Sequence, residues 1–133
     1  MKQIRKTESF EDLLVWQKAM NLVGKIYGAC RNQPLSRDWG LRDQLQRTAV
    51  SIPANIAEGY ERGSHKGYLQ FLAIAKGSAG ELRCLIQVCE RVRYLERNPA
   101  EELTSETTEI SKMIMGLMSS LKRANNGTLT LAL

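Results

Sequence analysis

Apolar residues recur every three or four positions along most of the chain, which is the spacing of amphipathic α-helices. The pattern predicts helices over residues 9–32, 36–62, 64–95 and 99–124, after a basic N-terminal arm at 1–8 and before a C-terminal tail at 125–133. Four long helices with short connections predict one all-α domain, an antiparallel up-down-up-down four-helix bundle.

Residues at the ends of these stretches support the boundaries. Ser9 is a plausible N-cap for the first helix, and Gly63 closes the second directly before Ser64, a plausible N-cap for the third. Asn98 precedes Pro99, a pair typical of the cap and first position of a helix. We therefore expect the fourth helix to begin there.

One face of each helix is predicted to point into the core, because apolar positions fall on one side of a wheel with 3.6 residues per turn. These inward residues are Leu13, Trp16, Met20, Val23, Tyr27 and Cys30 in the first helix; Leu41, Leu45, Thr48, Ala49, Ile52 and Ile56 in the second; Tyr68, Phe71, Leu72, Ala75, Ala79, Leu82, Ile86 and Cys89 in the third; and Leu103, Thr107, Ile110, Ile114, Leu117 and Leu121 in the fourth.

The second helix carries an unusual set of residues opposite its core stripe. Arg47, Ser51, Ala54, Glu58 and Arg62 share that side. Solvent-facing positions favour long polar side chains, whereas Ser51 and Ala54 are small and stand between charges. We expect another backbone or another subunit to approach the helix closely here.

Pro53 lies inside the same helix and has no N–H to donate to the carbonyl of Ala49. A kink is the expected consequence. An alternative is that Pro53 only shapes the bundle, and that Asn55 and Glu58 are solvated. The sequence leaves both interpretations open.

The third helix has a second apolar flank, formed by Ile74, Leu85, Val88 and Val92. Together with the core stripe it is wider than the roughly 100° that a helix packed on one side needs. The surplus predicts burial between subunits.

Three further residues of this helix are unusual. Gly77 and Gly80 lie mid-helix, where each costs about 1 kcal/mol relative to alanine, so we expect a close backbone approach; a tolerated weak spot is the alternative. Glu81 lies near the second flank, and we expect it to be a buried partner of an arginine from the second helix or from a neighbouring subunit.

Composition adds a positive charge to this picture. Aromatic residues make up only 6% of the chain. The 19 Lys and Arg residues outnumber the 14 Asp and Glu residues and give a net charge of +5, which favours a polyanionic partner such as RNA. The predicted nucleic-acid-binding residues are Arg37, Arg42, Arg47, Arg62, Lys66, Arg91, Arg93 and Arg97.

The sequence contains no recognisable catalytic, cofactor or metal motif. His65 is the only histidine, so a catalytic triad or a multi-histidine metal site could be built only around it. The three cysteines form no C-x-x-C pair, and no apolar run approaches the ~18 residues of a membrane helix. We expect a soluble cytoplasmic protein with reduced thiols that is not an enzyme and binds no cofactor, metal or membrane.

Three segments carry a resemblance to a known family. FEDLLVWQKA at 10–19, SIPANIAEG at 51–59 and FLAIAKGS at 71–78 resemble the four-helix-bundle family named after the 23S ribosomal RNA intervening sequence, also called S23. The likeness spans about residues 10–95. It departs at Gly80, where the family more often has a larger apolar residue, and at Tyr60. The motif positions that the resemblance implies are Trp16, Gln44, Arg47, Ser51, Asn55, Glu58, Gly59, Arg62, Phe71, Ser78 and Glu81.

The resemblance implies a bundle that assembles into a homo-pentamer with a central channel. Members are encoded within inserts of bacterial ribosomal RNA genes. A related branch, the accessory variability protein of diversity-generating retroelements, binds a reverse transcriptase and RNA.

Three hypotheses about function follow. The leading one is a non-enzymatic, ring-like oligomeric bundle that binds structured RNA or another nucleic acid. The second is an accessory scaffold that recruits a reverse transcriptase, and the third is a structural bundle without a ligand. The residues predicted to serve the oligomer interface or the polar motif are Ser51, Ala54, Asn55, Glu58, Ile74, Ser78, Glu81 and Val88.

Overall fold

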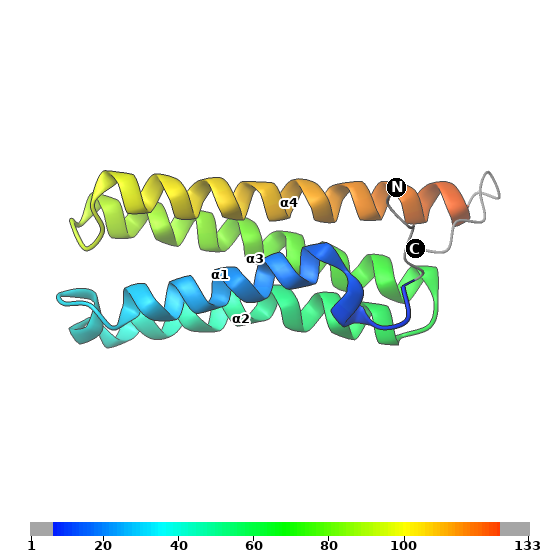
Figure 1. Ribbon diagram of the computed structural model, residues 1–133, viewed down its shortest axis with the longest axis horizontal. Helices are drawn as coiled ribbons and strands as arrows, with labels where there is room; N and C mark the ends of the chain where they lie inside the picture. Colours follow the sequence, from blue (N-terminus) through cyan, green and yellow to red (C-terminus); the bar gives the residue numbers. More distant parts are fainter. Residues whose placement is uncertain (1–6, 126–133) are drawn as a thin grey trace, which may run out of the picture.

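The computed structural model describes residues 7–125, and the helices that it contains are the four predicted long ones and two short 3-10 turns. Most of the predicted arm and nearly all of the predicted tail lie outside these residues. Figure 1 shows the long helices side by side, each running in the opposite direction to the one before it. In chain order the elements are η1 (Phe10–Asp12), α1 (Leu14–Cys30), η2 (Leu35–Arg37), α2 (Trp39–Glu61), α3 (His65–Arg91) and α4 (Arg97–Asn125).

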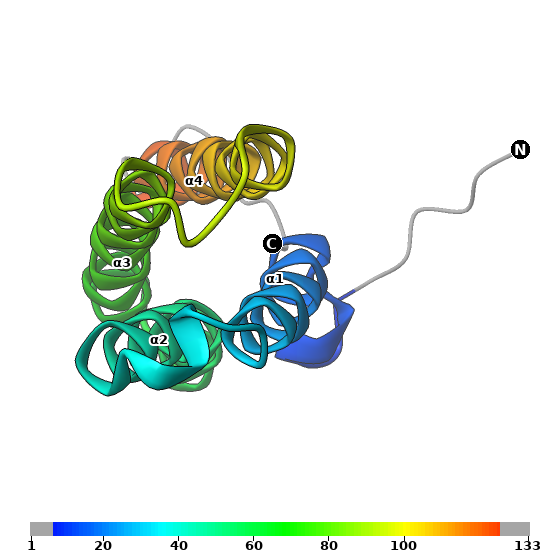
Figure 2. The ribbon, with the colours of Figure 1, turned by 90° about the vertical axis from the view of Figure 1, so that its left-hand side faces the viewer.

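Viewed along the bundle, the helices follow one another around the core in chain order (Figure 2). The α2–α3 and α3–α4 pairs pack most extensively, and the α1–α4 pair packs least. Two short ion pairs join α1 to α4: Lys18 Nζ lies 2.7 Å from Glu109 Oε1, and Lys25 Nζ lies 2.7 Å from Glu106 Oε1. Helices α2 and α3 therefore form the best-packed part of the molecule together with α4.

Three helix starts differ from the prediction by two residues or more. Helix α2 begins at Trp39 and not at residue 36, because η2 precedes it as a separate turn. The other two differences are at α1 and α4. Residues 10–12 form a 3-10 turn, and α1 begins only at Leu14 because Leu13 is extended. At the other site α4 begins at Arg97, since the backbone N–H of Ala100 already donates to the carbonyl of Glu96 (3.1 Å). Pro99 then lies within the first turn, where its missing N–H has no helical partner to lose.

The predicted inward face of the first helix is confirmed only in part. Leu13 and Cys30 are buried and Trp16 and Val23 are half-buried, but Met20 and Tyr27 are exposed, since most of the buried stripe lies about one position away. Both stripes are apolar at the same spacing, so helical periodicity alone could not choose between them. The buried residues of α1 are Val15, Ala19, Leu22, Ile26 and Cys30.

The predicted core stripes of the other three helices are largely confirmed. Leu41, Phe71 and Leu117 are half-buried, and the remaining predicted residues are buried. Leu85, which was predicted on the outer flank of the third helix, is also buried, because it lies on the side of α3 that faces the core. Within residues 7–125, no helix combines the length and the apolar character that crossing a lipid bilayer requires.

The three cysteines differ in exposure, which gives a testable chemical pattern. Cys30 and Cys89 are buried and Cys84 is exposed. Burial raises the pKa of the Cys89 thiol to about 11, and it also raises the pKa of Cys30. Since the thiolate is the reactive form, both buried thiols should be inert near neutral pH.

We therefore expect iodoacetamide at pH 8 to add at most one label, at Cys84, to the folded protein and three labels in guanidinium chloride, as read by intact mass. Rapid addition of a second label to the folded chain would contradict the burial of Cys30 and Cys89.

The raised pKa values also make stability depend on pH. The stabilising effect of the protonated thiols is complete below pH 9.0, the ordinary pKa of a cysteine. It is lost as the pH rises towards about 11, because only the unfolded chain ionises there.

Candidate functional site

Polar side chains connect α2 to α3 along one line. Thr48 Oγ1 and Gln44 Nε2 donate to Glu81 Oε2, at 3.0 and 3.3 Å. One turn further along α2, the hydroxyls of Ser51 and Ser78 are 2.8 Å apart. We call these residues, with Asn55, the polar seam. It brings together Gln44, Ser51, Asn55, Ser78 and Glu81, five of the motif residues.

Asn55 ties the seam to the turn that contains Pro53. Its Nδ2 donates to the backbone carbonyl of Ser51 (2.7 Å) and lies 2.9 Å from the Ser51 hydroxyl. Helix α2 continues through Pro53, which is buried. Asn55 is therefore engaged with the preceding turn, whereas Glu58 is exposed and pairs with Arg62 at 2.9 Å.

The two helices approach each other closely at Gly59. A Cβ atom at this position would lie 2.9 Å from Phe71 Cβ and 3.2 Å from the carbonyl oxygen of Tyr68. The guanidinium of Arg62 covers the outer side of the same contact, 4.8 Å from the centre of the Phe71 ring. Only glycine fits between the helices here, which explains why this motif position carries no side chain.

Three expectations about α2 and α3 can be compared with the structure. The close approach expected at Ser51 is made by α3 of the same chain, where Ser78 faces it, so no second subunit is needed to explain its size. A Cβ on Gly77 or Gly80 would meet nothing within 4 Å, so no backbone approaches them within the chain. Glu81 is exposed, where a buried side chain was expected, and within the chain it accepts hydrogen bonds from Gln44 and Thr48 of α2; an arginine partner from another subunit stays a prediction.

The side of α3 that turns away from the bundle is weakly polar. Ile74 is 50% exposed and Val88 is 38% exposed, and Gly77 and Gly80 lie between them along the helix. Ala54 of α2 is also exposed. We call Ala54, Ile74, Gly77, Gly80 and Val88 the outer face. The structure thus separates the predicted interface residues into the polar seam, which serves packing within the chain, and the outer face.

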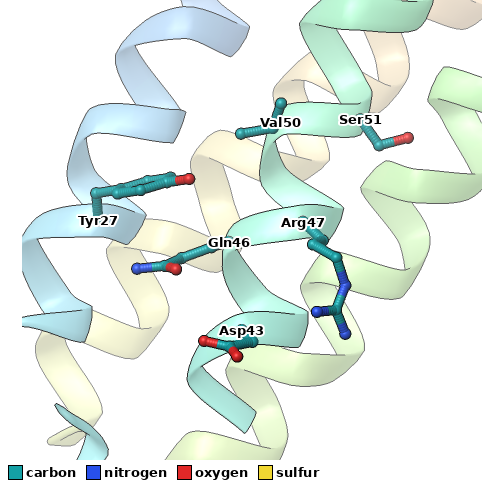
Figure 3. Close-up of a pocket in the computed structure, with 6 residues that line it drawn as sticks. All are labelled: Tyr27, Asp43, Gln46, Arg47, Val50 and Ser51. Atoms are coloured by element: carbon teal, nitrogen blue, oxygen red, sulfur yellow. The ribbon is translucent and has the colours of Figure 1, made fainter. Parts of the chain in front are cut away.

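A shallow hollow of about 370 Å³ lies beside the seam, on the exposed side of α2. Figure 3 shows Tyr27 of α1 and Gln46 of α2 on one side of α2, and the side chain of Arg47 on the other. Arg47 is exposed and makes no hydrogen bond or ion pair with any described residue. Asp43, Val50 and Ser51 complete the lining.

The predicted basic residues do not form one patch. Arg62 and Lys66 lie at one end of the bundle, where α2 connects to α3 (Figure 1). Arg42 lies near the opposite end of α2, about 30 Å away at 1.5 Å per residue. Arg47 lies between the ends. Arg37, Arg91, Arg93 and Arg97 share the end that carries Arg42.

These basic residues also differ in how far their charge is already compensated. Arg42 pairs with Asp43 at 3.2 Å, and Arg97 pairs with Glu101 at 2.8 Å. In contrast, several exposed side chains have no ion-pair or hydrogen-bond partner among residues 7–125. These are Arg37, Arg47, Lys66, Arg91 and Arg93.

Comparisons with known proteins fit this arrangement. The sequence profile of the family described as 23S rRNA-intervening sequence protein matches residues 11–116, from η1 to well inside α4. This chain belongs to that family.

A solved structure is similar to this chain over most of its length. It is a protein of unknown function from the S23 ribosomal protein family of Bacteroides thetaiotaomicron VPI-5482, with 25% sequence identity and a TM-score of 0.73. The similarity covers 79% of this chain and 98% of that one. Among curated proteins, none matches the chain.

Sequence reasoning passed over one residue of this family member. Trp39, the first residue of α2, is 70% exposed, more than any other large apolar side chain in the described part of the chain. Beside it, Tyr94 Oη donates to Asp38 Oδ2 at 3.0 Å. The available signal was that Trp39 precedes Leu41, where the core stripe of α2 begins, and has an arginine two positions before it.

The described residues of this family member contain no group of three or more His, Cys, Asp or Glu that could hold a metal ion. His65 is exposed at the start of α3. The chemistry that the surface offers consists of exposed guanidinium and ammonium groups, one exposed indole and a weakly polar helix face. These groups are suited to binding other macromolecules.

Proposed function

We propose that this chain is a cytoplasmic, non-enzymatic helical bundle that associates with copies of itself and binds structured RNA or another nucleic acid through its exposed basic residues. The homo-pentamer implied by the family resemblance is the expected form of the assembly. The ring would place several copies of each basic residue side by side.

The outer face supports the first half of the proposal. Ile74 and Val88 expose apolar surface to water. Gly77 and Gly80 destabilise the helix relative to alanine, and no contact inside the chain requires glycine at either position. A helix of another copy can approach such a face closely, because nothing projects from the two glycines. Ala54 is also small and exposed, so this surface of small side chains continues onto α2.

The uncompensated basic residues are the single observation that carries the second half. Five of the eight predicted residues are exposed and have no carboxylate partner among residues 7–125. Their charges are therefore available to phosphates. The net charge of +5 works in the same direction. Phosphate contacts of this kind read the shape of an RNA and release bound counterions.

We expect the protein to bind a structured RNA hairpin from a ribosomal insert at 50 mM salt, and to bind it about 100-fold more weakly at 200 mM. The estimate follows from releasing the counterions of roughly four phosphates per copy. Fluorescence anisotropy of a labelled hairpin gives both affinities. Absence of binding at 50 mM salt would refute nucleic-acid binding.

The alternative is an accessory scaffold that binds a reverse transcriptase together with RNA in a diversity-generating retroelement. The outer face favours a protein partner, since Ile74 and Val88 are apolar. Gene neighbourhood separates the two settings: a reverse transcriptase gene next to this one favours the scaffold, and a position inside a ribosomal RNA operon favours the intervening-sequence role. Co-purification with that reverse transcriptase would then test the scaffold directly.

A further inference from the structure

The end of the bundle that holds the α1–α2 and α3–α4 connections combines an exposed indole with uncompensated arginines. Trp39 is 70% exposed, and Arg37, Arg91 and Arg93 are exposed without partners among the described residues. The rest of the bundle surface has no comparable combination within residues 7–125, because the half-buried Trp16 is the other tryptophan.

Two contacts hold the connections at this end together. Tyr94 Oη donates to Asp38 Oδ2 (3.0 Å), which joins the α3–α4 connection to the start of α2. Cys30 Sγ contacts the carbonyl of Arg42 at 4.0 Å, which joins the end of α1 to the same helix. Arg37 and Trp39 flank Asp38 in the sequence, and Arg93 precedes Tyr94. The hydrogen bond therefore joins the segment that carries Arg37 and Trp39 to the segment that carries Arg93 at this end of the bundle.

Both oxygens of the Asp38 carboxylate accept hydrogen bonds from within the chain. Its Oδ1 accepts the backbone N–H of Leu41 (3.2 Å) as the N-cap of α2, while its Oδ2 accepts the Tyr94 hydroxyl. The carboxylates of Asp43 and Glu101 are engaged with Arg42 and Arg97. Arg37, Arg91 and Arg93 at this end therefore form no ion pair with any described carboxylate.

The backbone of Arg93 adds an independent observation. Its φ angle is +65°, in the left-handed region that favours glycine, and it directly follows Val92, the C-cap of α3. The backbone N–H groups of Tyr94 and Leu95 both donate to the carbonyl of Cys89, at 2.8 and 3.2 Å, and so close the helix end. Glycine would serve this turn better, so an exposed arginine here points to a use for its side chain.

We propose that this end of the bundle binds unpaired nucleotides, with Trp39 stacking on a base and Arg37 and Arg93 contacting the adjoining phosphates. Bases in loops, bulges and single strands expose their faces, and aromatic side chains with nearby arginines are the groups that bind them. The inference rests on the proposed binding of nucleic acid and goes further by naming the site and the single-stranded character of its ligand.

Trp39 fluorescence tests the proposal, in a Trp16→Phe background that leaves it as the only tryptophan. The probes are a 12-nucleotide oligouridine and a blunt RNA duplex of equal length, both at 50 mM salt. We expect the oligouridine to quench Trp39 and the duplex not to. In the unaltered chain, Trp39→Leu should weaken oligouridine binding about tenfold, as read by anisotropy.

The arginines are tested by Arg37→Gln combined with Arg93→Gly. This pair should lower the slope of log affinity against log salt by about 1.4. Arg93→Gly alone should raise the melting temperature and still weaken binding, which a purely structural role would not produce. Lys112→Gln removes an exposed charge in the middle of α4 and serves as the control, with less than a twofold change expected.

Four results would overturn the inference. The first is oligouridine binding that neither quenches Trp39 nor changes in Trp39→Leu; it would leave the proposed function intact. The second is equal affinity for heparin, which would show attraction by charge alone. The third is shielding of Trp39 from acrylamide in the RNA-free protein, which would assign this end to a protein interface. Failure to bind either oligouridine or the structured hairpin would remove the proposed function as well.

Discussion

Replacement of Gly59 by valine is expected to lower the free energy of unfolding by more than about 4 kcal/mol, enough to unfold most domains of ordinary stability. The Cβ atom alone would lie 2.9 Å from Phe71 Cβ, 3.1 Å from Tyr68 Cδ1 and 3.2 Å from the Tyr68 carbonyl oxygen. None of these atoms is the free end of a flexible side chain. Helices α2 and α3 would have to separate at this contact.

Gly116→Ala is the matched control, because it introduces a methyl group on α4, away from the outer face, where nothing lies within 4 Å. We expect it to stabilise the fold by about 0.5–1 kcal/mol through the better helix propensity of alanine. Urea unfolding followed by circular dichroism, at one fixed protein concentration, measures both variants. Equal and small effects of the two substitutions would contradict the close approach at Gly59.

Tryptophan substitutions at Ser51 and Ala54 are expected to have large and different effects. Ala54 is exposed, so Ala54→Trp should leave the helical content unchanged while reducing the assembly to single copies. The Ser51 hydroxyl lies 2.8 Å from that of Ser78, so Ser51→Trp should force α2 away from α3 and reduce the helical content. The two positions are three residues apart on one helix.

Size-exclusion chromatography with light scattering gives the mass of each variant, and circular dichroism gives its helical content. Ala54→Trp with the mass of the unaltered protein would remove α2 from the interface between copies. A Ser51→Trp protein that folds and melts like the unaltered chain would show that the Ser51–Ser78 contact is unimportant.

Much of the fold could be predicted from the sequence because on three helices the apolar residues with core spacing form the buried face, although α3 also carries a second apolar flank. On α2, α3 and α4 the residues with core spacing, such as Ile52, Leu82 and Ile114, are fully buried. Helix α1 has two neighbouring apolar stripes, and the choice between Val15 and Trp16 as inward residues depends on how α1 rotates against its neighbours. That rotation is a tertiary property which local spacing does not encode.

The candidate site was predictable as a set of residues but not as a set of contacts. Ser51, Ser78 and Glu81 could be selected from the sequence, whereas their partners depend on the register between two antiparallel helices. In this register Thr48 lies opposite Glu81. Arg47, the preceding residue, points about 100° away around the helix and does not contact the Glu81 carboxylate. The pattern therefore did not identify Gln44 and Thr48 as the partners of Glu81 within the chain.

Trp39 was missed for a related reason. Its exposure depends on where the core stripe of α2 begins, and its arginine neighbours include Arg93, which is 54 positions away in the sequence. Only the hydrogen bond between Tyr94 and Asp38 shows that the two connections meet. Contacts between loops of this kind leave no periodic trace in the sequence.

The central claim is that copies of the chain cover the outer face formed by Ala54, Ile74, Gly77, Gly80 and Val88. Sedimentation equilibrium of the unaltered protein over a range of micromolar concentrations tests it most directly. We predict a mass that is a whole-number multiple of 15.0 kDa, with five copies expected. A mass of 15.0 kDa at every concentration would mean that Ile74 and Val88 remain exposed to water, and would contradict the claim.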